Sequence, residues 1–124
     1  MDITPTAPQG RQVIQGYGDG RFTVSGVAYE GAVLVFQDRT VRWPVTGLSD
    51  VTAESLEAVL ERRPGVEILL LGCGPRMLPV PLPLRLALRE RGLSLDPMDT
   101  GAACRTFNVL NLEDRRVAAA LLPV

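Results

Sequence analysis

The sequence predicts an α/β protein built around a mixed β-sheet that is antiparallel on one side. Three observations support this prediction. The first third of the chain consists of short strand-like segments separated by turn residues, the pattern then changes to helical spacing, and a wholly apolar run follows at Val66–Leu71. Strands buried on both faces have this composition and are typical of parallel sheets. Strands followed by alternating helices and strands indicate an α/β domain.

The first third is expected to form an antiparallel meander. Asp19-Gly20 lies between two short apolar-rich segments and is a good hairpin signal. Pro44 limits the last of these strands to an edge or an end, because proline cannot donate to a strand ladder. The strands are expected at Arg11–Tyr17, Arg21–Ser25, Ala32–Phe36 and Thr40–Trp43.

A helix is expected next, at Ala53–Arg62. Thr52 is a suitable N-cap, and Pro64-Gly65 ends the helical pattern. The apolar positions of this segment recur at helical spacing, so that one face can pack on the sheet. The buried strand Val66–Leu71 then follows.

The segment Leu82–Arg91 fits two structures. Its leucines alternate as in a strand, but Pro83 suits the first turn of a helix and Gly92 suits its C-terminal cap. We expect a helix here. A short strand, Leu93–Leu95, is expected to follow and to be broken by Asp96-Pro97.

The chain is expected to end with a helix at Gly101–Leu112 and a strand at Arg116–Leu122. Either Asp99 or Thr100 can cap this helix, since both residue types prefer that position. The length of 124 residues suits one domain, expected over residues 11–124, after a flexible tail of residues 1–10.

Composition excludes several classes of partner. The net charge is −1 and the 13 basic residues are dispersed, so we expect no nucleic-acid partner. There is no signal-peptide pattern and no apolar run of the roughly 18 residues that a membrane span needs, so we expect a cytoplasmic protein without a membrane span. The antiparallel edge strands leave a homo-oligomer open.

Composition also excludes much active-site chemistry. Every basic residue is arginine, so that the chain has no lysine for a Schiff base and no histidine for an imidazole base. Cys73 and Cys104 are the only cysteines and cannot form a tetrahedral zinc site alone. We therefore expect two reduced thiols, no metal and no cofactor.

A site, if there is one, is expected beyond the carboxyl end of Val66–Leu71. The strands around the Leu82–Arg91 helix form a βαβ unit, whose parallel strands end at the same edge of the sheet. Two turns and a helix N-terminus, which favours anions, should meet there. The candidate ligand-binding residues are Gly72, Cys73, Gly74, Arg76, Asp99, Thr100 and Thr106, with Cys104 beside them.

Each of these candidates also has a purely structural interpretation. The two glycines can simply allow a tight turn. The segment is a poor dinucleotide fingerprint, because Met77 stands where the third glycine should be. A thiol at Cys73 beside a helix N-terminus and an arginine could be activated, but the chain offers no histidine as its base. We therefore expect no catalytic residue.

The order and spacing of several motifs resemble a known family, called domain of unknown function four-nine-eight, over roughly residues 13–122. The motifs are Phe22-x-Val24-x-Gly26-x-x-Tyr29-x-Gly31, Trp43-Pro44, Leu71-Gly72-x-Gly74, Met98-Asp99-Thr100-x-Ala102-x-x-x-Thr106-Phe107-Asn108-x-Leu110 and Arg115-Arg116-Val117-Ala118-Ala119-Ala120-Leu121.

The resemblance implies a three-layer α/β domain with a mixed central sheet. The family includes bacterial and archaeal proteins without assigned activity and a mitochondrial assembly factor for respiratory complex I. Members often carry threonine where Cys73 stands and tyrosine where Phe107 stands, so neither side chain is required there. The resemblance supplies no catalytic residues.

Two functional hypotheses follow. The first is a non-enzymatic protein-interaction module that binds a protein partner and helps assemble a respiratory complex, as the resemblance implies. The alternative is a small-anion or small-ligand binding protein, or a weak enzyme, that uses the Gly72–Arg76 edge.

Overall fold

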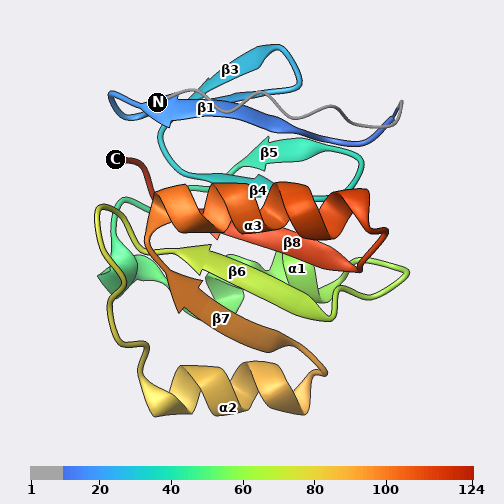
Figure 1. The fold of residues 1–124 in the computed structure, drawn as a ribbon. Coiled ribbons are helices and arrows are strands. Elements are labelled where there is room, and N and C mark those ends of the chain that lie inside the picture. Colours follow the sequence, from blue (N-terminus) through green and yellow to red (C-terminus); the bar gives the residue numbers. More distant parts are fainter. Residues whose placement is uncertain (1–9) are drawn as a thin grey trace.

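The structure is a computed structural model that describes residues 10–124, so the predicted tail lies almost entirely outside the described residues. The strands form a five-stranded sheet and a separate three-stranded sheet. Figure 1 shows α3 across one face of the larger sheet, α1 behind the other face, and the smaller sheet above it. The strands of the central sheet run in the order β5-β4-β8-β6-β7. The predicted three-layer α/β class with a mixed sheet is confirmed.

The predicted meander is divided between two sheets. β1 (Ile14–Gly18), β2 (Arg21–Val24) and β3 (Val27–Glu30) form the small antiparallel sheet. β4 (Val33–Val35) and β5 (Thr40–Arg42) instead form one side of the central sheet.

The predictions missed β3. A two-residue turn at Ser25-Gly26, with φ of 47° and 82°, returns the chain from β2 into β3. Such primed turns match the twist of the strands they join. The Asp19-Gly20 hairpin between β1 and β2 is confirmed, with φ of 53° and 75°.

The helix predicted at Ala53–Arg62 is much shorter than expected. A 3₁₀ turn at Glu54–Leu56 follows another at Leu48–Asp50, and α1 covers only Glu57–Leu60. Thr52 is not the N-cap of either helical element that follows it, since Ala53 and Leu56 hold those positions, but its hydroxyl accepts a hydrogen bond from the Ser55 N–H at 3.1 Å.

The second half of the chain builds the parallel part of the sheet. β6 (Ile68–Gly72), α2 (Leu82–Glu90) and β7 (Ser94–Met98) form the predicted βαβ unit, and β6 and β7 are parallel neighbours. α3 (Thr100–Leu112) then leads to β8 (Val117–Leu121), which lies between β4 and β6. β8 is antiparallel to β4 and parallel to β6.

The prediction that Asp96-Pro97 breaks the preceding strand is wrong. β7 continues through Pro97, which lies opposite Leu71 of β6. Proline is tolerated because β7 is an edge strand, so that the missing N–H can face away from the ladder.

Two apolar cores lie on opposite faces of the central sheet. Leu69 and Leu71 of β6 pack toward α1 and α2, and Leu70 packs toward α3. The strand Val66–Leu71 was predicted to be buried on both faces, and the three leucines confirm this, since none is more than 1% exposed. Among residues 10–124, none of the helices has the length and apolar content that a membrane crossing requires.

Candidate functional site

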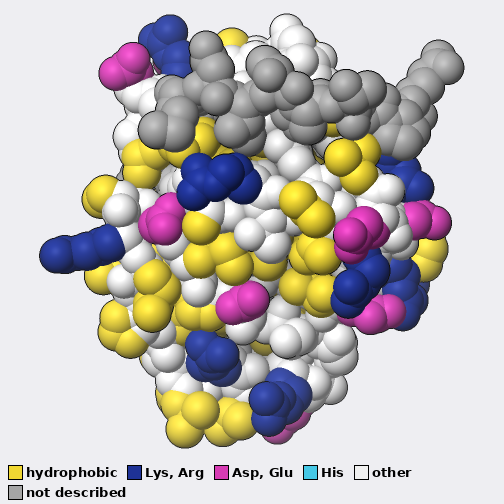
Figure 2. Space-filling model, in the orientation of Figure 1, with side chains coloured by type: hydrophobic (Ala, Val, Ile, Leu, Met, Phe, Trp, Pro, Cys, Tyr) yellow, Lys and Arg dark blue, Asp and Glu magenta, His cyan; other side chains and the backbone are white. Residues whose placement is uncertain are grey.

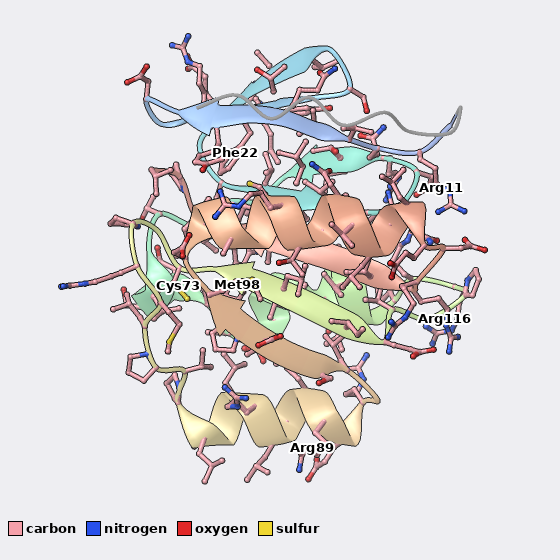
Figure 3. All side chains as sticks on the ribbon, viewed as in Figure 1. Arg11, Phe22, Cys73, Arg89, Met98 and Arg116 are labelled. Atoms are coloured by element: carbon pink, nitrogen blue, oxygen red, sulfur yellow. The ribbon has the colours of Figure 1, made fainter. Side chains whose placement is uncertain are left out.

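The turns after β6 and β7 meet at one edge of the sheet, as the sequence predicts. The Cys73 N–H donates to the Met98 carbonyl at 2.9 Å, and the Thr100 N–H donates to the Gly74 carbonyl at 2.8 Å. Figure 3 shows Cys73 and Met98 side by side beneath the start of α3. The predicted convergence of two turns and a helix N-terminus is therefore present.

Thr100 fills the centre of this edge. Its hydroxyl accepts from the Gly74 N–H at 2.9 Å and donates to the Leu122 carbonyl at 2.7 Å. The side chain is fully buried. One hydroxyl thus joins the turn after β6, the start of α3 and the end of β8.

Gly72 is a glycine for a packing reason. A Cβ atom there would lie 3.0 Å from the Leu121 Cδ2 atom and 3.0 Å from both the Cα and Oγ1 atoms of Thr100. Contacts this short would require these neighbours to shift by a few tenths of an ångström, so the missing side chain favours the close approach of β6 to α3. Gly74 has a φ of 106°, a backbone conformation that favours glycine, and so allows the turn after β6.

The N-terminus of α3 is covered by the protein's own side chains. The Asp99 carboxylate accepts from the Ala102 N–H at 2.8 Å, so that Asp99, one of the two predicted caps, is the N-cap. Tyr17 of β1 lies over Gly101, where a Cβ atom would come within 2.5 Å of the tyrosine hydroxyl. That hydroxyl also accepts from the Arg105 guanidinium at 3.1 Å.

The two cysteines are free, buried and on opposite faces of the sheet. The Cys73 Sγ atom lies 3.7 Å from the Leu71 carbonyl oxygen and 3.9 Å from that of Leu78. Burial raises the pKa of the Cys104 thiol to about 12, so that it stays protonated at neutral pH. A protonated, buried thiol at Cys104 is not an activated nucleophile.

The remaining candidates do not join this cluster. Arg76 is exposed, and no described residue forms an ion pair or hydrogen bond with its side chain. Thr106 lies farther along α3 and is half-buried, and its hydroxyl forms no hydrogen bond with the described part of the chain. Ligand binding at this edge stays a prediction, and the geometry gives its buried members a structural use.

Two hollows of the described surface lie away from this edge. One open hollow of about 580 Å³ runs along Trp43 and Pro44. The Trp43 side chain is itself buried, and its indole N–H donates to the Ser55 carbonyl at 2.7 Å. A groove of about 90 Å³ lies between α2 and β7.

Sequence reasoning missed two buried asparagines of α3. Asn108 donates to the Ile14 carbonyl and accepts from the Ile14 N–H, both at 2.9 Å, while Asn111 donates to the Gln12 carbonyl at 3.1 Å. Together they fasten β1 to α3. The signal was present, because asparagine at one-turn spacing on a buried helix face needs polar partners.

The fold and this edge define a class: a mixed-sheet α/β protein in which a buried polar cluster joins the ends of secondary-structure elements. The chain belongs to the family described as "Protein of unknown function (DUF498/DUF598)", whose model matches residues 14–122.

The chain is similar to proteins of known sequence from bacteria and animals. It is 38% identical over 111 residues to an uncharacterized protein of Rhodobacter capsulatus, covering 90% of this chain and 84% of that protein. It is 35% identical over 111 residues to the Danio rerio NADH dehydrogenase (ubiquinone) 1 alpha subcomplex assembly factor 3, covering 90% of this chain. It spans 64% of the length of that assembly factor and 60% of the Homo sapiens protein of the same name.

Solved structures share the fold. A protein described as an outer membrane protein from Bartonella henselae is 41% identical with a TM-score of 0.84, covering 93% of this chain and 97% of that one. A Bordetella pertussis protein described as an Mth938-like domain is 29% identical with a TM-score of 0.82, covering 99% of this chain and 92% of that one.

Proposed function

We propose that this protein is a non-enzymatic assembly factor that binds a protein subunit or another assembly factor during the building of a respiratory NADH dehydrogenase, on the cytoplasmic side of the membrane. The observation that carries the proposal is the 35% identity to the Danio rerio assembly factor over 90% of this chain. The segment that matches the family model, residues 14–122, includes the whole central sheet and α3.

The chemistry of the described residues supports a binding role over catalysis. The chain has neither histidine nor lysine, and both thiols are buried. The polar groups at the carboxyl edge of the sheet are used in hydrogen bonds between its own elements. General acid–base catalysis needs a titratable group that a substrate can reach. The buried groups of this cluster are not accessible to a substrate.

Complementation tests the proposal. Cultured zebrafish cells that lack their own assembly factor 3 would receive this chain fused to a mitochondrial targeting segment. We expect partial recovery of the assembled NADH dehydrogenase on native gels and of rotenone-sensitive NADH oxidation. The vector without the chain is the control. Equal complex levels in both, with the chain present and folded in the organelle, would contradict the proposed function.

A further inference from the structure

The outer face of α2 combines exposed leucines with arginines that lack acidic partners. Leu82, Arg85, Leu86 and Arg89 follow the spacing i, i+3, i+4, i+7 and therefore form one stripe along the helix. Leu82 is 64% exposed and Leu86 is 47% exposed. Figure 2 shows yellow and dark blue side chains beside each other over α2, at the bottom of the molecule.

The apolar part of this stripe is unusual in the described chain. Six large apolar side chains are exposed, and Met77, Leu82 and Leu86 are three of them. Other side chains pack the inner face of α2 against the sheet: Leu88 is fully buried and Leu84 is partly buried in the core. The outer leucines are thus not needed to hold the helix on the sheet, and clustered exposed apolar side chains mark interaction sites.

The arginines of this stripe form no ion pairs with described residues, although the exposed Glu90 follows Arg89 in α2 and the exposed Asp96 lies on β7. Residues 68–89 contain three arginines, Arg76, Arg85 and Arg89, and no aspartate or glutamate. None of these three forms an ion pair within the described part of the chain. Five of the ten other arginines pair with carboxylates, namely Arg11, Arg21, Arg62, Arg91 and Arg116. Figure 3 shows Arg89 on α2 at the lower edge of the molecule.

The stripe borders a groove into which a side chain can insert. Leu82, Arg85 and Leu86 line one wall of this groove of about 90 Å³, and Leu93 and Leu95 line the other. An apolar anchor in such a hollow, with charges at the rim, is the usual anatomy of a protein interface.

The adjoining edge of β7 is poorly suited to accept another strand. The Ser94 N–H and the Met98 carbonyl are both used toward β6, so the alternate residues Leu95 and Pro97 direct their backbone groups to the open side. Pro97 has no N–H, and the Leu95 carbonyl accepts from the Arg85 guanidinium at 3.4 Å. Both features protect an edge from strand addition.

These observations assign one occupant. We propose that the α2 face, defined as Leu82, Arg85, Leu86 and Arg89 with the groove beside it, binds an acidic amphipathic helix of a protein partner. Arg85 and Arg89 are four residues apart, a rise of roughly 6 Å, so that two carboxylates four residues apart on the partner helix match them. An apolar residue between those carboxylates would occupy the groove. This inference rests on the proposed assembly function and specifies where the partner binds.

A binding experiment tests the recognition chemistry directly. The probe is a synthetic helical peptide of leucine and glutamate, with glutamates four residues apart, titrated into the labelled full chain and followed by NMR. We expect shifts confined to residues 82–95. Replacing the glutamates by glutamine, or introducing Arg85→Glu with Arg89→Glu, should weaken binding at least tenfold. Arg39→Glu, at an exposed arginine without an ion pair in the described chain, is the matched control and should bind normally.

The outcomes separate the alternatives. Equal binding of the glutamate and glutamine peptides, shifts outside residues 82–95, or binding to anionic phosphatidylglycerol vesicles without peptide binding would overturn the inference. If the double variant loses its folded spectrum, Leu86→Gln replaces it, with the same expected loss. In the complementation assay, rescue by the wild-type chain together with equal rescue by the double variant would overturn the inference alone, whereas failure of the wild-type chain contradicts the assembly function itself.

Discussion

At the carboxyl edge of the sheet, stability depends on single buried groups. Thr100→Val keeps the shape of the side chain but leaves the Gly74 N–H and the Leu122 carbonyl without their partner. We expect a loss of about 2 kcal/mol in the free energy of unfolding, because unsatisfied buried groups keep their desolvation cost. Urea denaturation measures it. Thr106→Val is the matched control, and an equal loss in both variants would contradict this role of Thr100.

The buried thiol of Cys104 makes stability depend on pH. Burial raises its pKa from 9.0 to about 12 in the folded protein. Above pH 9 the unfolded chain loses this proton while the folded chain keeps it, so the folded state is progressively disfavoured as the pH rises from 9 to 12. The stability advantage of the wild-type protein over Cys104→Ala should therefore shrink across this range. Denaturation at several pH values measures the difference, and parallel pH profiles would contradict the prediction.

At the scale of elements, side chains of α3 replace a missing strand partner for β1. Asn108→Ala removes both hydrogen bonds to Ile14, in a position only 6% exposed. We expect a loss of about 2–3 kcal/mol and faster hydrogen exchange at the Ile14 amide, since two buried backbone groups lose their partners. Val109→Ala, at an exposed neighbouring position, should change neither quantity much. Unchanged exchange at Ile14 in Asn108→Ala would show that β1 is held by other contacts.

The elements differ in how far the sequence predicts them. α3 and β8 were predicted to within about two residues, because a capping aspartate and a continuous apolar run are local signals. The shortness of α1 could not be predicted, since its pattern is helical and only its packing decides where the helix begins. β3 was missed because it is largely exposed, and strands without a buried face lack the alternating pattern.

The position of the carboxyl-edge cluster was predicted, but its hydrogen bonds were not. Thr100 and Leu122 are far apart in the sequence and meet only in the folded protein.

At the scale of the whole molecule, any pairing of two copies through their sheets would use the open outer strands. The outer strands of the central sheet are β5 and β7, and Pro97 and Arg85 obstruct the edge of β7. Pairing of two copies through the exposed strand β3 or through β5 stays a prediction. Light scattering tests this prediction. Pairing through these edges should give the mass of a dimer, and the mass of one chain would contradict it.

The central place of β8 has a consequence for synthesis on the ribosome. β8 is made after the other four strands of the central sheet. It alone joins the antiparallel side, β4 and β5, to the parallel side, β6 and β7. A nascent chain that stops before Val117 therefore holds two unconnected half-sheets with their apolar faces open. We expect ribosome-bound chains to remain protease-sensitive until residues 117–122 have left the exit tunnel and then to become resistant in one step. Resistance in shorter nascent chains would contradict this order of folding.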